Sequence, residues 1–450
     1  MNRVVNILGY QFYIREILVI LFSFLLMENI FSWLVFPVST VILAFEKVMS
    51  LVIFGFVLYH FTDLKRNEQI YIGVFCLVML RLVFESLFSY GTIFQQLTMF
   101  TVLFPVVFTI FIKCISRSLK LDLLEFLAKF YLIVYVLVMI IYGRGFSFSL
   151  ASVDMQDYGP FSGDSRIIHA RSILMMIIPL LWFFSRFLET SKLKFFLPFL
   201  FSLVVIVIHQ HRSVWASAII ALLVFFILSF RNSFIKAPKA VGLVLSGAVL
   251  VVISGVIVSY LYPQFLGFLS DRFSEILDPA RDGGTGKFRE DQREVYYKLF
   301  LKRPIFGWTF EGFDMPNPLV DWWPVKSGQH FHEGYMEMLF YHGIVGLVLK
   351  YWFLIFLAFK GFSRRLSRES IVLIAFSMSG LVFSFSYVLP LIFWGVVGLC
   401  LYYVEKADEA PVEYPDPLTG DDRILLDEPV RLNARKKHET FQLNSTTPNR

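Results

Sequence analysis

Long apolar runs alternate with short polar stretches along most of the chain. Each run is close to the roughly 20 residues that a helix needs to cross the hydrocarbon core of a bilayer. Lipid offers no hydrogen-bond partner to an unpaired backbone group, so such runs are expected to be helical. The pattern predicts twelve membrane-spanning helices, at residues 16–37, 41–62, 70–90, 97–114, 123–142, 167–186, 194–210, 213–230, 241–262, 334–358, 370–387 and 389–404.

Basic residues fall mainly on one side of the predicted membrane. The short loops on the other side carry only Arg144, Arg166 and Arg212. Cytoplasmic loops are the ones enriched in Lys and Arg, so the basic side and both chain termini are expected to face the cytoplasm. The basic loops hold Lys65, Arg66, Lys113, Arg117, Lys120, Arg186, Lys192, Lys194, Arg231, Lys236, Lys239, Lys360, Arg364, Arg365 and Arg368.

The composition supports a membrane protein and bears on which partners it is expected to have. Charged residues make up 17% of the chain, against roughly a quarter in soluble domains. The formal charge of +6 arises from topology-setting loops, so the bilayer is an expected partner and nucleic acid is not. No cleavable signal peptide is expected, because the first apolar run is long and lacks a small-residue cleavage site. Three cysteines without a CxxC pair predict neither a disulfide framework nor a thiolate metal site.

These patterns divide an all-α integral membrane protein into four parts. Residues 1–262 hold the first nine spans, and residues 334–405 hold the last three. Residues 263–333 form one large periplasmic loop with short helices, between the ninth and tenth spans. Residues 406–450 have too few apolar residues to fold alone and are expected to be a disordered cytoplasmic tail.

The large loop contains a predicted amphipathic helix within the stretch GTGKFREDQREVYYKLFLKRPIFGWTFEGF. Pro304 is expected to end it. Arg289 and Arg293 are four residues apart, so they share one face of this helix. The helically spaced apolar positions are Val295, Tyr296, Leu299, Phe300 and Ile305.

Candidate chemistry gathers near the outer membrane surface. The two loop arginines are followed by His330 and His332, and Arg212 begins the eighth span. The planar fork of arginine makes two parallel charge-assisted hydrogen bonds to phosphate oxygens. Histidine can accept a proton at neutral pH. Outward arginines beside a histidine would therefore suit transfer of a group from a phosphorylated lipid to a hydroxyl acceptor. Arg171, at the outer end of the sixth span, could line the same outer cavity.

Several of these charges also have a plainer interpretation. Arg289 and Arg293 could pair with the acids beside them on a solvated helix, namely Glu290, Asp291 and Glu294. Arg212 could be an interfacial anchor, because arginine stems reach along apolar surface to water. Within the spans, Arg81 and Glu85 lie one turn apart and are expected to neutralise one another.

The histidines likewise allow alternatives. His330 and His332 could be hydrogen-bonding loop residues. Together with Glu333 they could also bind zinc. The HQH at 209–211 is a second, weak candidate for zinc binding. No third histidine follows at ligand spacing, because His342 is ten residues further on. We therefore expect no metal.

Three stretches resemble the bacterial O-antigen ligase and O-antigen polymerase superfamily of membrane glycosyltransferases. HEGYMEMLFYHGIVGL, from His332, resembles the signature H-N-x-Y-L-x-x-L-x-x-x-G-x-x-G-L, with matching spacing to Gly343 and Gly346. RPIFGWTFEGF resembles the turn P-L-x-G-x-G-x-x-x-F at the end of the periplasmic loop. HRSVWASAIIALLV resembles a span that begins S-R. The resemblance covers about residues 165–405. This chain departs from the signatures at Glu333, where asparagine is common, at Thr309, where glycine is usual, and at Arg293, where an aromatic residue is expected.

The resemblance implies roles for these residues in a metal-independent inverting glycosyltransferase without a cofactor. His332 would be the catalytic base or a residue that positions the acceptor. Arg212 and Arg289 would hold the diphosphate of an undecaprenyl-diphosphate-linked glycan, with Arg293 as the substitute for Arg289. His330 would orient the acceptor. The remaining candidate substrate contacts are Arg166, Arg171, Trp322 and Trp323, of which the two tryptophans could instead anchor the loop.

The favoured function is polymerisation of O-antigen or exopolysaccharide repeat units at the periplasmic face of the bacterial inner membrane. The acceptor would be a glycan or a lipid-linked glycan, and a chain-length regulator is a candidate partner. One alternative is an O-antigen ligase that attaches the glycan to lipid A-core or to protein. A second is a polysaccharide flippase or transporter, which would place ionisable residues along a path near the membrane midplane. A membrane sensor would need a folded cytoplasmic domain that the tail does not supply.

Overall fold

The computed structural model describes residues 4–7, 10–13, 50–120, 122–142, 170–209, 211–235, 285–319, 331–363 and 365–409, together with Gly242, Val256 and Tyr260. This part of the chain is helical apart from turns, loops and one antiparallel hairpin. In the hairpin, β1 (Val4–Ile7) pairs with β2 (Tyr10–Tyr13). The hairpin lies before the first predicted span and departs from the all-α expectation.

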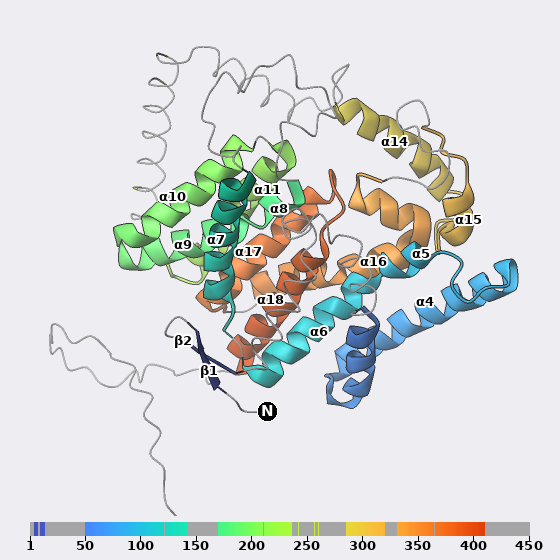
Figure 1. Cartoon of the computed structure of the whole chain (residues 1–450), viewed down its shortest axis with the longest axis horizontal. Coiled ribbons are helices and arrows are strands. Elements are labelled where there is room, and N and C mark those ends of the chain that lie inside the picture. Colours follow the sequence, from blue (N-terminus) through green and yellow to red (C-terminus); the bar gives the residue numbers. More distant parts are fainter. Residues whose placement is uncertain are drawn as a thin grey trace, which may run out of the picture. The chain divides into compact units, whose positions relative to one another are not determined.

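Apart from α14 and α15, which lie in the predicted loop, the helices overlap the apolar runs of the sequence; Figure 1 shows their arrangement. Two predicted spans, 97–114 and 167–186, are each divided into a short and a longer helix. The predicted span 16–37, and 241–262 apart from its three isolated positions, lie outside the described residues. The helices are Ser50–Tyr59, the 3-10 turn Phe61–Asp63, α4 (Arg66–Tyr90), α5 (Leu97–Thr101), α6 (Phe104–Leu119), α7 (Leu124–Tyr142), α8 (Ala170–Leu174), α9 (Ile177–Thr190), α10 (Leu193–Ile208), α11 (Arg212–Arg231), α14 (Thr285–Phe300), α15 (Thr309–Asp314), α16 (Gly334–Ser363), α17 (Arg368–Phe383) and α18 (Leu391–Glu409).

Within the described residues, four helical stretches are long and apolar enough to cross a membrane. These stretches and the apolar helices around them make the chain a membrane protein. The count of twelve spans and the large periplasmic loop stay predictions. The four stretches are Arg66–Tyr90, Ala170–Thr190, Arg212–Arg231 and Gly334–Ser363.

α17 is the central helix of the packing. It contacts α9, α11, α16 and α18, and α18 packs in turn against α6. Every residue of α17 from Ser370 to Gly380 is buried. A helix that is apolar all round must be enclosed by other helices, which explains its position.

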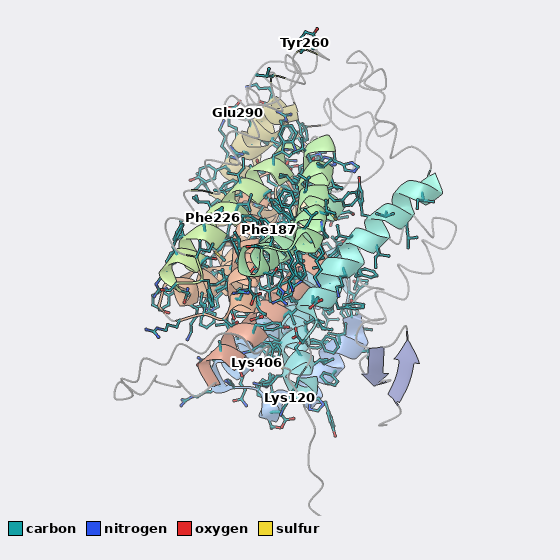
Figure 2. All side chains as sticks on the ribbon, turned by 90° about the vertical axis from the view of Figure 1, so that its left-hand side faces the viewer. Lys120, Phe187, Phe226, Tyr260, Glu290 and Lys406 are labelled. Atoms are coloured by element: carbon teal, nitrogen blue, oxygen red, sulfur yellow. The ribbon has the colours of Figure 1, made fainter. Side chains whose placement is uncertain are left out.

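The basic ends of α6 and α18 lie far from α14. Figure 2 shows Lys120 and Lys406 at one end and Glu290 of α14 at the other, with Phe187 and Phe226 between them. This arrangement is the one expected if the basic loops and the candidate site face opposite sides of a membrane.

An ion cluster ties together residues from three separate basic-side segments. The Glu405 carboxylate lies 2.6 Å from the Nζ of Lys65, 2.6 Å from the Nζ of Lys113 and 3.3 Å from a guanidinium nitrogen of Arg117. Lys113 also pairs with the buried carboxylate of Glu68. The contacts place these loops on the same side, as their charge pattern predicts.

α16 is broken at Gly343, whose φ of 62° and ψ of −159° lie outside the helical region. The loop between α14 and α15 fills the break. The backbone nitrogens of Ile344 and Val345 donate hydrogen bonds to the carbonyl oxygens of Pro304 at 2.9 Å and Ile305 at 3.1 Å. The loop thus satisfies helical N–H groups that the break would otherwise leave without acceptors.

The same loop also binds the part of α16 before the break. The backbone nitrogen of Trp308 donates to the carbonyl oxygen of Phe340 at 2.8 Å. Gly307, which precedes Trp308, has a φ of 70° and lies directly against the backbone of Tyr341. The loop and the broken helix therefore form one interlocked unit, which fixes the start of α16.

Candidate functional site

One face of α14 packs against the residues that precede α16. The ring of Phe288 contacts the ring of His332 edge-on, with centroids 5.5 Å apart. One turn later, the Oε1 of Gln292 accepts a hydrogen bond from the backbone nitrogen of His332 at 3.3 Å. After another turn, Tyr296 packs against Phe331 with centroids 4.6 Å apart. The amphipathic helix predicted from the sequence is confirmed, and His332 lies against it.

Arg293 and Glu333 form a two-point ion pair beside this face. The Nε and Nη2 of Arg293 donate to the two carboxylate oxygens of Glu333, at 3.2 Å and 2.5 Å. The side chain of Glu333 is only 4% exposed, whereas that of Arg293 is 51% exposed. Burial raises the pKa of the Glu333 carboxyl above its ordinary value, against the lowering effect of Arg293 and Arg289. The hydrogen bond to Glu333 raises the pKa of Arg293.

The acids on α14 pair with lysines and not with the two arginines. Glu290 lies 3.2 Å and Asp291 lies 3.5 Å from the Nζ of Lys287. Glu294 lies 2.7 Å from the Nζ of Lys298. The plainer interpretation of the arginines, as partners of these acids on a solvated helix, is therefore not what the structure shows.

Arg289 is held by an aromatic ring. Its guanidinium lies over the ring of Tyr387, 5.2 Å from the centroid. The Nε of Arg289 is buried, and it has no hydrogen-bond partner within the described part of the chain. A guanidinium that keeps unused donors can still bind an anion.

Tyr387 belongs to the segment that follows α17, and this segment is bonded to the start of α16. The backbone nitrogen of Gly334 donates to the carbonyl oxygen of Ser384 at 2.9 Å. The hydroxyl of Tyr335 donates to the carbonyl oxygen of Leu381 at 2.7 Å. The candidate site is therefore built from α14, the start of α16 and the end of α17.

Arg212 and Arg171 belong to a neighbouring group of helices. Arg212 is the first residue of α11, and α8, which carries Arg171, packs against α11. His211 caps α11 and is buried, and the Nε2 of His209 lies 2.9 Å from the hydroxyl of Tyr135. The imidazole of His209 thus has the hydroxyl of Tyr135 as its hydrogen-bond partner.

Other candidates fall outside the described residues. These are His330, Arg166, Trp322 and Trp323, the outer loop 143–166 and the tail from residue 410 onward. Among the residues that the structure does describe, no group of three His, Cys, Asp or Glu side chains could hold a metal ion.

The predicted intramembrane pair is confirmed and has an additional partner. Arg81 and Glu85 lie 2.9 Å apart. The hydroxyl of Thr309 donates to the Glu85 carboxylate, and the Arg81 guanidinium lies 4.5 Å from the centroid of the Phe306 ring. These contacts attach the interlocked loop to α4.

Sequence reasoning missed Phe288, Gln292 and Tyr387 as site residues. The first two could have been found, because they lie eight and four residues before Tyr296 and so continue its buried face. Tyr387 carries no such signal, since only the fold brings the end of α17 beside α14.

The site lies within a segment that matches a known family. No curated protein matches the chain. The family model described as O-antigen ligase matches residues 197–351. This range extends from α10 to α16 and so contains Arg212, Arg289, Arg293 and His332. The match over residues 197–351 therefore supports the O-antigen ligase and polymerase superfamily for this chain.

Proposed function

We propose that the chain transfers a glycan from an undecaprenyl-diphosphate carrier to a sugar hydroxyl at the periplasmic face of the bacterial inner membrane. The match of residues 197–351 to the O-antigen ligase model supports an O-antigen ligase or polymerase type of activity. The observation that carries the proposal is the packing of α14 on His332, which brings an imidazole and an arginine with unused donors to one place.

The reaction follows from the chemistry of these groups. His332 accepts the proton of the acceptor hydroxyl, and the hydroxyl oxygen attacks the anomeric carbon of the donor sugar. The bond from that carbon to the diphosphate breaks, and attack from the opposite face inverts the configuration. Arg289 and Arg212 stabilise the negative charge that develops on the departing diphosphate. No step requires a metal.

The remaining candidates take supporting roles in the proposal. His330 orients the acceptor, while Arg166 and Arg171 line the outer cavity. Trp322 and Trp323 either stack on sugar faces or anchor the loop at the membrane surface. The proposed orientation keeps both chain termini in the cytoplasm.

The proposed product is a polymer of repeat units, because the acceptor side departs from the family signature at Glu333. The runner-up is a ligase that attaches the glycan to lipid A-core or to protein. Both use the same donor chemistry. A chain-length regulator is the proposed protein partner of the polymerase.

Analysis of glycans from a deletion strain separates these functions. Single repeat units capped on lipid A-core would indicate a lost polymerase, and full-length chains left on the carrier would indicate a lost ligase. Repeat units trapped on the cytoplasmic leaflet would indicate a flippase and refute glycosyl transfer.

Complementation of the deletion strain tests the catalytic assignment. His332→Ala should fail to restore long chains at normal membrane abundance. His60→Ala, which alters an exposed histidine bonded to Asp63 on the basic side, should restore them. Normal chains from the His332→Ala variant would end the proposal.

A further inference from the structure

We propose that Arg293 is a positioning residue, whose ion pair with Glu333 fixes α14 against His332, and that Arg289 is the arginine of α14 that binds the diphosphate. This inference rests on the proposed function and assigns separate tasks to the two arginines. It replaces the sequence-based expectation that either one could serve as the phosphate ligand.

The first argument is the state of each guanidinium. Arg293 donates from two nitrogens to both oxygens of Glu333, so its bidentate face is occupied. Arg289 has a buried Nε without a partner within the described residues, and an aromatic ring holds its guanidinium. Arg289 thus keeps its Nε donor for a phosphate oxygen, whereas in Arg293 the edge formed by Nε and Nη2 is taken by Glu333.

The second argument is the burial of Glu333. Glu333 follows His332 directly in the chain, and its side chain is almost fully buried. An unpaired carboxylate at this position would be costly to bury and would repel an anionic diphosphate. Arg293 neutralises it, so the positive charge of Arg293 is needed by Glu333 and is not available to the substrate.

The third argument is that α14 contacts His332 and the residue after it at three points. Gln292 accepts from the His332 nitrogen, Phe288 contacts its ring, and Arg293 binds the next residue. Contacts at 288, 292 and 293 fix both the rotation and the position of α14 along its axis. That geometry also sets where Arg289 lies relative to the imidazole.

The two residues depart from the family signature together. Arg293 stands where an aromatic residue is expected and Glu333 where asparagine is common, and the structure pairs them. The two departures from the signature thus form one contact of opposite charges. This explains how the chain can carry a carboxylate beside the proposed catalytic histidine.

Neutralising both partners distinguishes positioning from phosphate binding. Arg293→Met keeps the aliphatic stem but leaves Glu333 unpaired, so kcat should fall about 10-fold to 100-fold with little change in the KM for the donor. Adding Glu333→Gln removes the unpaired charge, and Arg293→Met/Glu333→Gln should recover to within about fivefold of the original kcat. The assay uses the purified full-length protein with undecaprenyl-diphosphate-linked repeat units.

Arg289→Met is the matched comparison on the same helix. It should raise the KM for the donor by about tenfold or more, and Glu333→Gln should not rescue it. Failure of Glu333→Gln to rescue Arg293→Met, together with a raised donor KM equal to that of Arg289→Met, would overturn the inference and make Arg293 a diphosphate ligand.

Two controls separate this inference from the proposed function. If the unaltered protein transfers no glycan, the proposed function fails. If the unaltered protein is active and His332→Ala is not, an unrescued Arg293→Met variant counts against the positioning role alone. Thermal midpoints of every variant identify a loss that comes from unfolding.

Discussion

Gly307 and Gly343 meet backbone to backbone. A Cβ added to Gly307 would lie 2.7 Å from the nitrogen of Gly343, and a Cβ added to Gly343 would lie 2.4 Å from the carbonyl oxygen of Ile305. Both glycines have positive φ, at 70° and 62°. The glycines of the two resembling stretches thus allow the loop to enter the broken helix, and their role is structural.

Alanine at Gly343 should therefore destabilise the protein by about 2 kcal/mol or more, because a side chain adds both steric overlap and a strained φ. Loss of thermal midpoint in detergent, with reduced long-chain glycan, is the expected result. Gly73→Ala is the matched control, since Gly73 is helical and has no atoms within 4 Å of an added Cβ. A Gly343→Ala variant as stable as Gly73→Ala would contradict the interlocked arrangement.

The sequence was most informative where the position or partner of a residue depends on a single helix. The apolar runs located the long described helices, and the spacing up to Phe300 located α14. The pairing of Arg81 with Glu85 followed from their separation by one turn. Such features depend on local geometry, which repeats from protein to protein.

Features that depend on two distant segments could not be read from the chain. Ile305 was predicted to continue the apolar face of α14, yet its side chain is exposed and its carbonyl caps the second half of α16. The match of Arg293 with Glu333 spans forty residues and was hidden among nearer acids. Helical spacing predicts an acid close in sequence as the partner of Arg293, whereas tertiary packing pairs it with Glu333.

Replacement of Thr309 by serine should cost less stability than replacement by valine. Thr309 has a φ of 45°, which is unusual for a β-branched residue, and its hydroxyl donates to Glu85. Thr309→Val loses the donor and should cost about 1–3 kcal/mol. Thr309→Gly loses the donor but relieves the backbone, so its thermal midpoint should lie between those of Thr309→Ser and Thr309→Val. A valine variant as stable as the serine variant would show that the hydroxyl contributes nothing.

The ring of Tyr387 should matter for donor binding more than its hydroxyl. The ring supports the Arg289 guanidinium, and a cation over an aromatic face is stabilised by about 0.5–2 kcal/mol. Tyr387→Phe keeps that face and should leave the donor KM near its original value. Tyr387→Leu removes it and should raise the KM about threefold to tenfold. Equal donor KM values for the two variants would show that the ring of Tyr387 does not support donor binding by Arg289.

The stability of the protein should depend on pH through Glu333. Its folded-state pKa is raised by burial, so the folded chain binds this proton more tightly than the unfolded chain does. That contribution is fully present below the ordinary glutamate pKa and is lost as pH rises through the raised value. The charged groups that face the Glu333 carboxyl are Arg293 and Arg289 of α14.

Comparison with Glu333→Gln isolates this effect, because glutamine does not titrate. The thermal midpoint of the original protein minus that of the variant should fall as the pH rises from about 4 to about 8. A difference that grows over this interval would mean that ion pairing with Arg293 outweighs burial and lowers the pKa instead.

Thiol labelling should show that α14 and the basic loops lie on opposite sides of the membrane. Glu290 and Lys120 are both exposed, and Figure 2 places them at opposite ends of the helices. Intact cells should therefore allow a membrane-impermeant maleimide to label Glu290→Cys, while Lys120→Cys should react only after permeabilisation. Lys298→Cys and Lys406→Cys provide a second exposed position at each end, and the unaltered chain gives the background from its native cysteines. Labelling of Lys120→Cys and not Glu290→Cys in intact cells would place His332 in the cytoplasm, where no periplasmic acceptor could reach it.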